Sequence, residues 1–214
     1  LTYRYLGRHL ASHGYTVLQP THVGSDTAAV LKRTPLLAFQ PGELLNRVED
    51  VRFTLDLMDE NKLPESVEGR LDRDRVALVG HSFGALTAQA MAGLAVEDAQ
   101  GQELDVEDSR IKAFVAMSPF GNSFPSKWLR IQPDTYDRVE SPILYMSGEH
   151  DRVFTLGKGP GVHAEPFAQT ASEDKAQLTI GGGFHLSFAQ VLGKVDSDTC
   201  SLAASTTTAF LDAH

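Results

Sequence analysis

Cysteine is almost absent from this sequence, and so is any long apolar run. With Cys200 as its single cysteine, the chain can form no internal disulfide and no zinc site built on cysteine pairs. A helix needs about 20 apolar residues to cross a membrane, and no run approaches that length. We therefore expect no membrane span. The scarcity of cysteine fits the cytoplasm, but the chain begins with Leu1 rather than Met, so secretion also stays open.

Positive charge is scarce as well. Lys and Arg number 19 against 28 Asp and Glu, which gives a formal net charge of −9 at pH 7. Nucleic acid is not an expected partner, because phosphate backbones are bound through clustered cations and no such cluster occurs. No repeat or linker divides the chain, so residues 1–214 are expected to form a single domain.

Helical and extended patterns alternate along the chain, which predicts an α/β fold with a mostly parallel sheet. One helix has apolar residues at steps of three and four: Leu44, Val48, Val51, Leu55 and Met58. On the same helix, Glu43 and Arg47 are expected to form an exposed pair. Further helices are expected at residues 2–13, 85–94 and 202–213, and strands at 15–19, 74–79, 111–117, 143–146 and 177–180.

The most informative motif is Gly80-His81-Ser82-Phe83-Gly84, which follows a predicted strand and precedes a helix-forming run. A serine on such a strained strand-to-helix turn projects its hydroxyl above the edge of the sheet. We expect Ser82 to be a nucleophile and the Phe83 backbone N–H to stabilise an oxyanion. Both glycines are expected to be required because a Cβ would collide with the neighbouring strand or helix. The alternative is a tight turn that only packs.

A nucleophilic serine needs a base and an acid that orients the base, and in such folds the acid and then the base follow the serine. Asp151 lies just past the strand at 143–146 and is the expected acid, in competition with Glu149 and Asp137. His185 follows the last predicted strand and three glycines, and is the expected base. Several other histidines are expected to be solvated or packed, without a catalytic role: His22, His81, His150, His163 and His214.

Two weaker patterns are better explained without a ligand. His9 and His13 have the spacing of zinc ligands on a helix, but the catalytic glutamate and a third ligand are missing, so an exposed helix surface is expected. The alternating glycines within residues 157–161 follow no strand and precede no Lys-Ser/Thr pair. They predict a loop rather than a phosphate-binding turn.

These motifs resemble those of the α/β hydrolases, and more narrowly the branch that is similar to dienelactone hydrolases and platelet-activating-factor acetylhydrolases. The shared segments span nearly the whole chain: residues 6–15, 22–26, 80–85, 148–151 and 183–185. The resemblance implies the α/β-hydrolase fold, with helices on both faces of the sheet. It also implies ester hydrolysis through an acyl-enzyme, with no metal and no organic cofactor.

One departure from the family concerns the start of the chain. Such enzymes place a His-Gly loop after their third strand, and a backbone N–H of this loop completes the oxyanion hole. Neither that loop nor the strands before it occur ahead of the helix at residues 2–13. The missing strand would lie between those at 15–19 and 74–79, so we expect an N-terminally truncated hydrolase domain whose second oxyanion donor lies outside this sequence.

The substrate pocket is expected to be apolar and formed by loops that follow the strands. Phe120, Trp128 and Phe154 are candidates for its wall, together with Phe83. A small-molecule, short-chain carboxylic ester is the expected substrate. The alternatives are a thioesterase or peptidase that uses the same three residues, and a binding protein of this fold without turnover. The sequence does not indicate an oligomeric state.

Overall fold

A sheet of four parallel strands forms the centre of the molecule. The computed structural model describes residues 3–23, 42–67, 69–98, 100–122, 130–132, 135–153, 159–190 and 196–214. Across the sheet the strands follow the order β1 (Val76–His81), β3 (Ile111–Met117), β5 (Ile143–Gly148) and β6 (Lys175–Ile180). Every neighbouring pair is parallel. The carboxyl ends of all four strands therefore meet at one edge, which is where ligand-binding loops gather in open parallel sheets.

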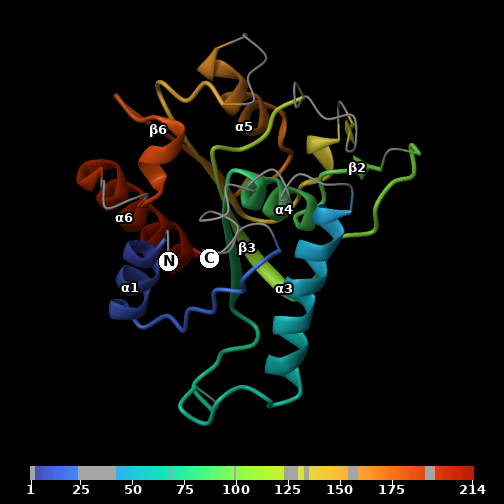
Figure 1. Cartoon of the computed structure of the whole chain (residues 1–214), viewed down its shortest axis with the longest axis vertical. Helices are drawn as coiled ribbons and strands as arrows, with labels where there is room; N and C mark the ends of the chain where they lie inside the picture. Colours follow the sequence, from blue (N-terminus) through green and yellow to red (C-terminus); the bar gives the residue numbers. More distant parts are fainter. Residues whose placement is uncertain are drawn as a thin grey trace.

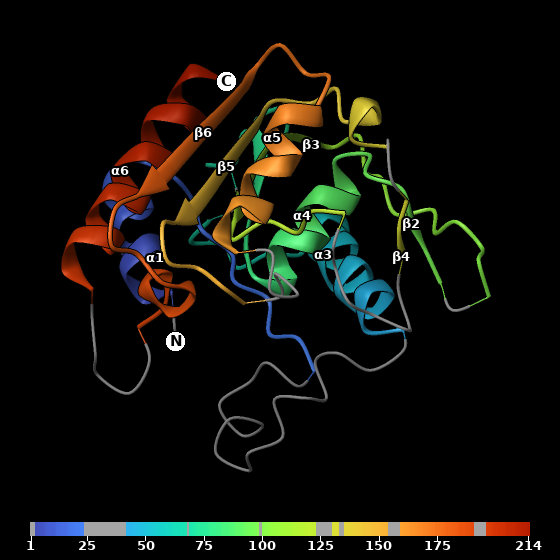
Figure 2. The same cartoon turned by 90° about the horizontal axis from the view of Figure 1, so that it is seen from above.

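Helices cover both faces of the sheet, as Figure 2 shows from above. One face carries two helices, α1 (Arg4–Ser12) and α6 (Ser197–Ala213). The other face carries three helices: α3 (Glu43–Asp59), α4 (Phe83–Met91) and α5 (Glu165–Gln169). Although they come from opposite ends of the chain, α1 and α6 lie side by side (Figure 1). The predicted α/β fold with a parallel sheet between helical layers is confirmed.

Shorter elements lie in the connections. Three of them are 3₁₀ turns: η2 (Tyr136–Arg138), η3 (Pro160–Ala164) and η4 (His185–Phe188). A two-residue antiparallel pair joins β2 (Val96–Glu97) to β4 (Arg130–Ile131). In the part of the chain that the structure describes, no helix is both long enough and apolar enough to cross a bilayer.

The sequence of β3 explains why helices pack on both faces of the sheet. Ala113, Val115 and Met117 pack toward α1 and α6, whereas Phe114 and Ala116 pack toward α3 and α4. Successive side chains of a strand point to opposite faces, so a strand that is apolar at consecutive positions is stable only between two layers. Each large side chain buried in this way contributes about 1.5–3 kcal/mol.

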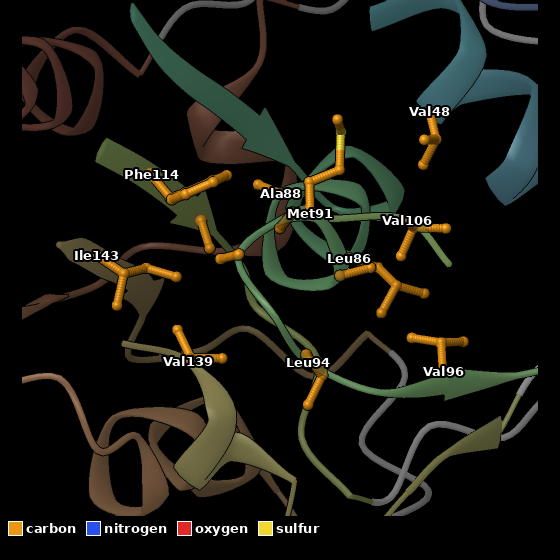
Figure 3. Packing of buried hydrophobic residues seen from close by; sticks show 14 of the residues in the cluster. Val48, Leu86, Ala88, Met91, Leu94, Val96, Val106, Phe114, Val139 and Ile143 are labelled. Atoms are coloured by element: carbon orange, nitrogen blue, oxygen red, sulfur yellow. The ribbon is translucent and has the colours of Figure 1, made fainter. Parts of the chain in front are cut away.

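The apolar stripe of α3 is buried against the sheet and α4, as its periodicity predicts. All five stripe residues are at most 7% exposed. The small, fully buried residues Ala85, Ala88 and Ala90 let α4 approach the sheet closely. Figure 3 shows side chains from α3 (Val48), α4 (Leu86) and β3 (Phe114) in this cluster.

The strand predicted at residues 15–19 is wrong, because this segment has no regular secondary structure. Tyr15 and Val17 still pack against the cluster that contains Ala77 and Val79 of β1. Among the described residues β1 pairs only with β3, so the segment at 15–19 packs beside β1 without pairing with it. Aromatic and β-branched residues favour a pleated surface, but a strand exists only when another strand pairs with it.

The expectation of an exposed Glu43–Arg47 pair is also wrong. Glu43 is 9% exposed and Arg47 is 5% exposed, because the first turns of α3 pack beside the start of α4. The guanidinium of Arg47 lies over the Phe83 ring, 4.9 Å from its centroid. Charged side chains at this helix end are therefore part of the packed interior.

Candidate active site

The turn that joins β1 to α4 holds Ser82 in an unusual backbone conformation. Its φ of 56° and ψ of −122° lie in a region that residues other than glycine rarely adopt. Two hydrogen bonds hold the turn in place. The Ser82 N–H donates to the Met117 carbonyl of β3 at 3.0 Å, and the Ser82 carbonyl accepts from the Ala85 N–H at 2.8 Å. Hydrogen bonds to both the sheet and the helix therefore hold Ser82 in this strained conformation, at the carboxyl edge of the sheet.

The two glycines of this turn are not equivalent. A Cβ at Gly80 would lie 2.0 Å from the Gly84 carbonyl oxygen and 2.9 Å from the Ala85 nitrogen. A Cβ at Gly84 would meet no atom within 4 Å outside the backbone of its own helix. The predicted collision therefore holds for Gly80 and is wrong for Gly84, because the carbonyl of Gly84, and not its Cα substituent, faces the strand.

Ser82, His185 and Asp151 form one continuous chain of contacts. His185 Nε2 lies 2.9 Å from Ser82 Oγ, and His185 Nδ1 lies 3.0 Å from Asp151 Oδ2. A carboxylate can only accept, so Nδ1 carries the proton of the neutral ring and Nε2 is left to accept from the serine hydroxyl. Asp151 is fully buried and His185 is 8% exposed. The structure thus brings together the three residues that the sequence singled out.

A close approach of two glycines joins the loops that carry Asp151 and His185. A Cβ at Gly148 would lie 2.3 Å from the Gly183 carbonyl oxygen, and one at Gly183 would lie 3.1 Å from the Gly148 Cα. Directly beside this contact, the His150 N–H donates to the Gly183 carbonyl at 2.8 Å. These contacts hold the loop that carries Asp151 against the loop that carries His185.

Comparison with known proteins places this geometry in a family. Residues 1–198 match the family described as the alpha/beta hydrolase family. The chain belongs to the alpha/beta hydrolase family.

Two relatives illustrate the relationship. The chain is 25% identical over 171 residues to the platelet-activating factor acetylhydrolase of the guinea pig, Cavia porcellus; the match covers 78% of this chain and 31% of that protein. The chain thus spans about a third of the length of this curated relative. A solved structure from a study of LipS and LipT, two metagenome-derived lipolytic enzymes, superposes with a TM-score of 0.61 at 17% identity, and the match covers 99% of this chain and 87% of that one. This second likeness shows the fold.

The carboxylate of Asp151 is held ionised. Burial alone would raise the pKa of Asp151, but contacts from the imidazoles of His163 and His185 lower it by more, so it lies well below the ordinary range. The Val153 N–H also donates to Oδ1 at 3.1 Å. A permanently charged carboxylate here favours the Nδ1-protonated form of His185 and stabilises the charge that the ring gains when it accepts a proton.

His81 is neutral and packs against His185. Its Nε2–H donates to the His185 carbonyl at 3.0 Å, and its Nδ1 accepts from the Tyr3 hydroxyl at 2.6 Å. Burial and the neighbouring His185 lower the pKa of His81 to about 3. The ring lies 4.7 Å from that of His185, centroid to centroid. His81 is therefore a packed residue with both nitrogens satisfied.

The competing carboxylates lie elsewhere. Glu149 is exposed and its Oε2 accepts from the Gly182 N–H at 3.0 Å. Asp137 is exposed in η2. His163, expected to be solvated or packed, is buried beside Asp151. No motif surrounds it in the sequence, so only its residue type could have drawn attention to it.

The predicted pocket residues have different surroundings. Phe120 is 3% exposed within the core, and its backbone is held by the side chain of Gln89 through two hydrogen bonds of 2.9 Å. Trp128 and Phe154 lie outside the described residues. A role of Phe120, Trp128 or Phe154 in substrate binding stays a prediction. An open pocket of about 600 Å³ lies next to His185. It is lined by His150, Arg152, Val153, Phe184, His185 and Leu186.

Proposed function

We propose that this hydrolase cleaves carboxylic esters through an acyl-enzyme, with Ser82 as nucleophile, His185 as general base and Asp151 as the acid that orients it. The observation that carries this proposal is the unbroken chain from Ser82 Oγ through His185 to Asp151, with contacts of 2.9 and 3.0 Å, at a strained strand-to-helix turn. A serine hydroxyl is a weak nucleophile until a base within hydrogen-bond reach accepts its proton.

The proposed reaction has two half-reactions. In the first, Oγ of Ser82 attacks the ester carbonyl while its proton moves to Nε2 of His185, and the imidazolium then protonates the departing alcohol. In the second, a water molecule attacks the acyl-serine ester, with His185 again accepting and returning the proton. Asp151 stays ionised throughout and stabilises the imidazolium.

Phe83 is the proposed oxyanion donor. It opens α4, so its N–H belongs to a helix N-terminus beside the nucleophile, where negative charge is favoured. The Phe83 side chain is buried beneath the guanidinium of Arg47, which fixes the residue that carries this N–H.

A small acyl group is the proposed substrate preference. The guinea pig relative is named as an acetylhydrolase, which supports a short acyl chain. Three of the six residues that line the pocket beside His185 are apolar, Val153, Phe184 and Leu186, and Phe184 and Leu186 are 58% and 60% exposed. An open apolar rim of this kind suits the non-reacting part of an ester.

The substrate preference is tested with p-nitrophenyl acetate, butyrate and octanoate. We expect kcat/KM to be highest for the acetyl or butyryl ester and at least about tenfold lower for the octanoyl ester, because a small site rejects surplus methylene groups. Rates that rise with chain length would instead indicate a lipid-binding groove. Matched thioester and amide substrates, if cleaved faster than the esters, would favour the alternative activities.

The nucleophile is tested by covalent labelling. A fluorophosphonate should phosphonylate Ser82 Oγ with loss of fluoride, and peptide mapping should find the adduct on Ser82. The heat-denatured protein and Ser82→Ala should remain unlabelled, because reactivity depends on the folded contact between Ser82 and His185. An adduct on another residue, or no adduct on the folded protein, would contradict the proposed function.

A further inference from the structure

A second histidine touches the carboxylate of Asp151. His163 lies in η3, is 3% exposed, and places its Nε2 3.3 Å from Asp151 Oδ1. Its other ring nitrogen, Nδ1, lies 2.6 Å from the carbonyl oxygen of Pro119, which follows β3. The mechanism proposed above gives this ring no part, although it is buried against the same carboxylate as the base.

The two contacts of His163 favour one protonation state of its ring. Both partners are acceptors: a backbone carbonyl at Nδ1 and an ionised carboxylate near Nε2. Nδ1 therefore carries a proton that it donates to the Pro119 carbonyl. A neutral ring of this form would place the lone pair of Nε2 close to a negatively charged oxygen, whereas a proton on Nε2 makes the contact with Asp151 an attractive ion pair.

The electrostatics agree with this geometry. Burial lowers the pKa of His163, but the side chain of Asp151 and the backbone of Pro119 and Val153 raise it by more, so it lies above the ordinary value. The contact is an ion pair rather than an aligned hydrogen bond, and it is buried on both sides. An ion pair removed from water is screened far less than one at the surface.

We propose that His163 is a positioning residue that, as an imidazolium, holds Asp151 between two imidazoles and offsets its negative charge. This inference rests on the proposed roles of Asp151 and His185. With His185 neutral, His163 and Asp151 together carry no net charge. The positive charge of His163 therefore offsets part of the attraction that the Asp151 carboxylate exerts on a proton at His185 Nε2.

The other ionisable groups around His163 do not take over this role. His81 on β1 is neutral, and its pKa is lowered by burial, by His185 and in part by His163. Glu165, at the start of α5, accepts from the Asn122 N–H at 3.2 Å. Asp151 is thus the carboxylate that pairs with His163, and His185 is the other imidazole in contact with it.

The protonation of His163 is read directly by ¹⁵N NMR of the histidine-labelled protein. The His163 signals are assigned as those lost in His163→Gln. About one pH unit above the ordinary histidine pKa of ~6.5, we expect both ring nitrogens of His163 to show the shifts of a protonated ring. A single neutral tautomer at that pH would overturn the proposal, whatever the enzymatic activity.

The pH profile tests the effect on the base. In His163→Gln an amide N–H can still face Asp151, but the positive charge is gone. With p-nitrophenyl acetate, we expect the acid limb of kcat/KM to move up by about one pH unit, which is about a tenfold lower rate on that limb. KM should not change, because His163 is placed to touch Asp151 and not the substrate. His163→Ala should lose more activity, since it removes both donors.

The controls separate this inference from the proposed function and from mere destabilisation. His13→Gln, at the exposed end of α1, should leave the profile unchanged. A uniform loss in His163→Gln at all pH values, without a shift of the acid limb, would mean a structural role only. If the wild-type protein neither turns over esters nor binds a fluorophosphonate, the proposed function fails, while the NMR experiment still decides the state of His163.

Discussion

Replacing Ser82 with alanine is expected to lower kcat for ester hydrolysis by about 10⁶-fold, close to the limit of detection. The hydroxyl that would form the acyl-enzyme is lost, while the buried Asp151–His185 pair and the fold around it are retained. Stopped-flow kinetics with an activated ester checks this result. The burst of alcohol that accompanies acylation should disappear along with steady-state turnover. A burst that persists in Ser82→Ala would assign the nucleophile to another residue.

Substitutions of His185 and Asp151 should lower kcat by different amounts, and these losses should not add to the loss in Ser82→Ala. His185→Ala should lose nearly as much as Ser82→Ala, and the double variant no more than either, because the hydroxyl and the base act as one unit. Asp151→Asn should lose about 10⁴-fold, since an amide cannot hold the imidazole in the required tautomer. Glu149→Gln is the matched control, an exposed carboxylate in the same loop whose removal should leave kcat unchanged.

The sheet and its helices could be predicted because their residues repeat the periods of strands and helices. Residues 111–117 were expected as a strand and form β3 with these bounds, since an apolar run this short between polar flanks fits a strand covered on both faces. The segment at 15–19 shows the opposite case. Its residues favour a strand, but pairing is a property of two segments, and composition reports on only one.

The candidate site was predictable as far as its residues follow strands in the expected order. Ser82, Asp151 and His185 follow the carboxyl ends of β1, β5 and β6 by one, three and five residues, so the parallel sheet brings them to one edge. His163 was not predictable, because it reaches Asp151 from η3 through a contact that no local pattern encodes. The different roles of Gly80 and Gly84 also depend on how α4 leaves the strand, which symmetric motif letters do not reveal.

Replacing Gly80 with alanine is expected to distort the turn between β1 and α4 that holds Ser82. The added Cβ would lie 2.0 Å from the Gly84 carbonyl oxygen, a backbone atom that α4 holds in place, so strand and helix must separate by more than a rotamer change could absorb. Overpacking of this kind costs about 1–3 kcal/mol of stability or more. Because a displacement of about 1 Å at a reacting group can cost about 10²-fold, we also expect at least that loss in kcat/KM. Thermal unfolding and ester kinetics measure the two effects.

Gly84→Ala tests whether the turn is disrupted only by a Cβ that collides with the backbone, or by any added side chain. Its Cβ meets no atom within 4 Å outside its own helix, and Gly84 does not have the positive φ that would strain an alanine. Alanine is a better helix former than glycine by about 1 kcal/mol, so the free energy of unfolding should stay constant or rise. If Gly84→Ala were destabilised as much as Gly80→Ala, the close approach of the Gly84 carbonyl to Gly80 could not be what fixes Ser82. The strain at Ser82 would then have to come from its own hydrogen bonds to Met117 and Ala85.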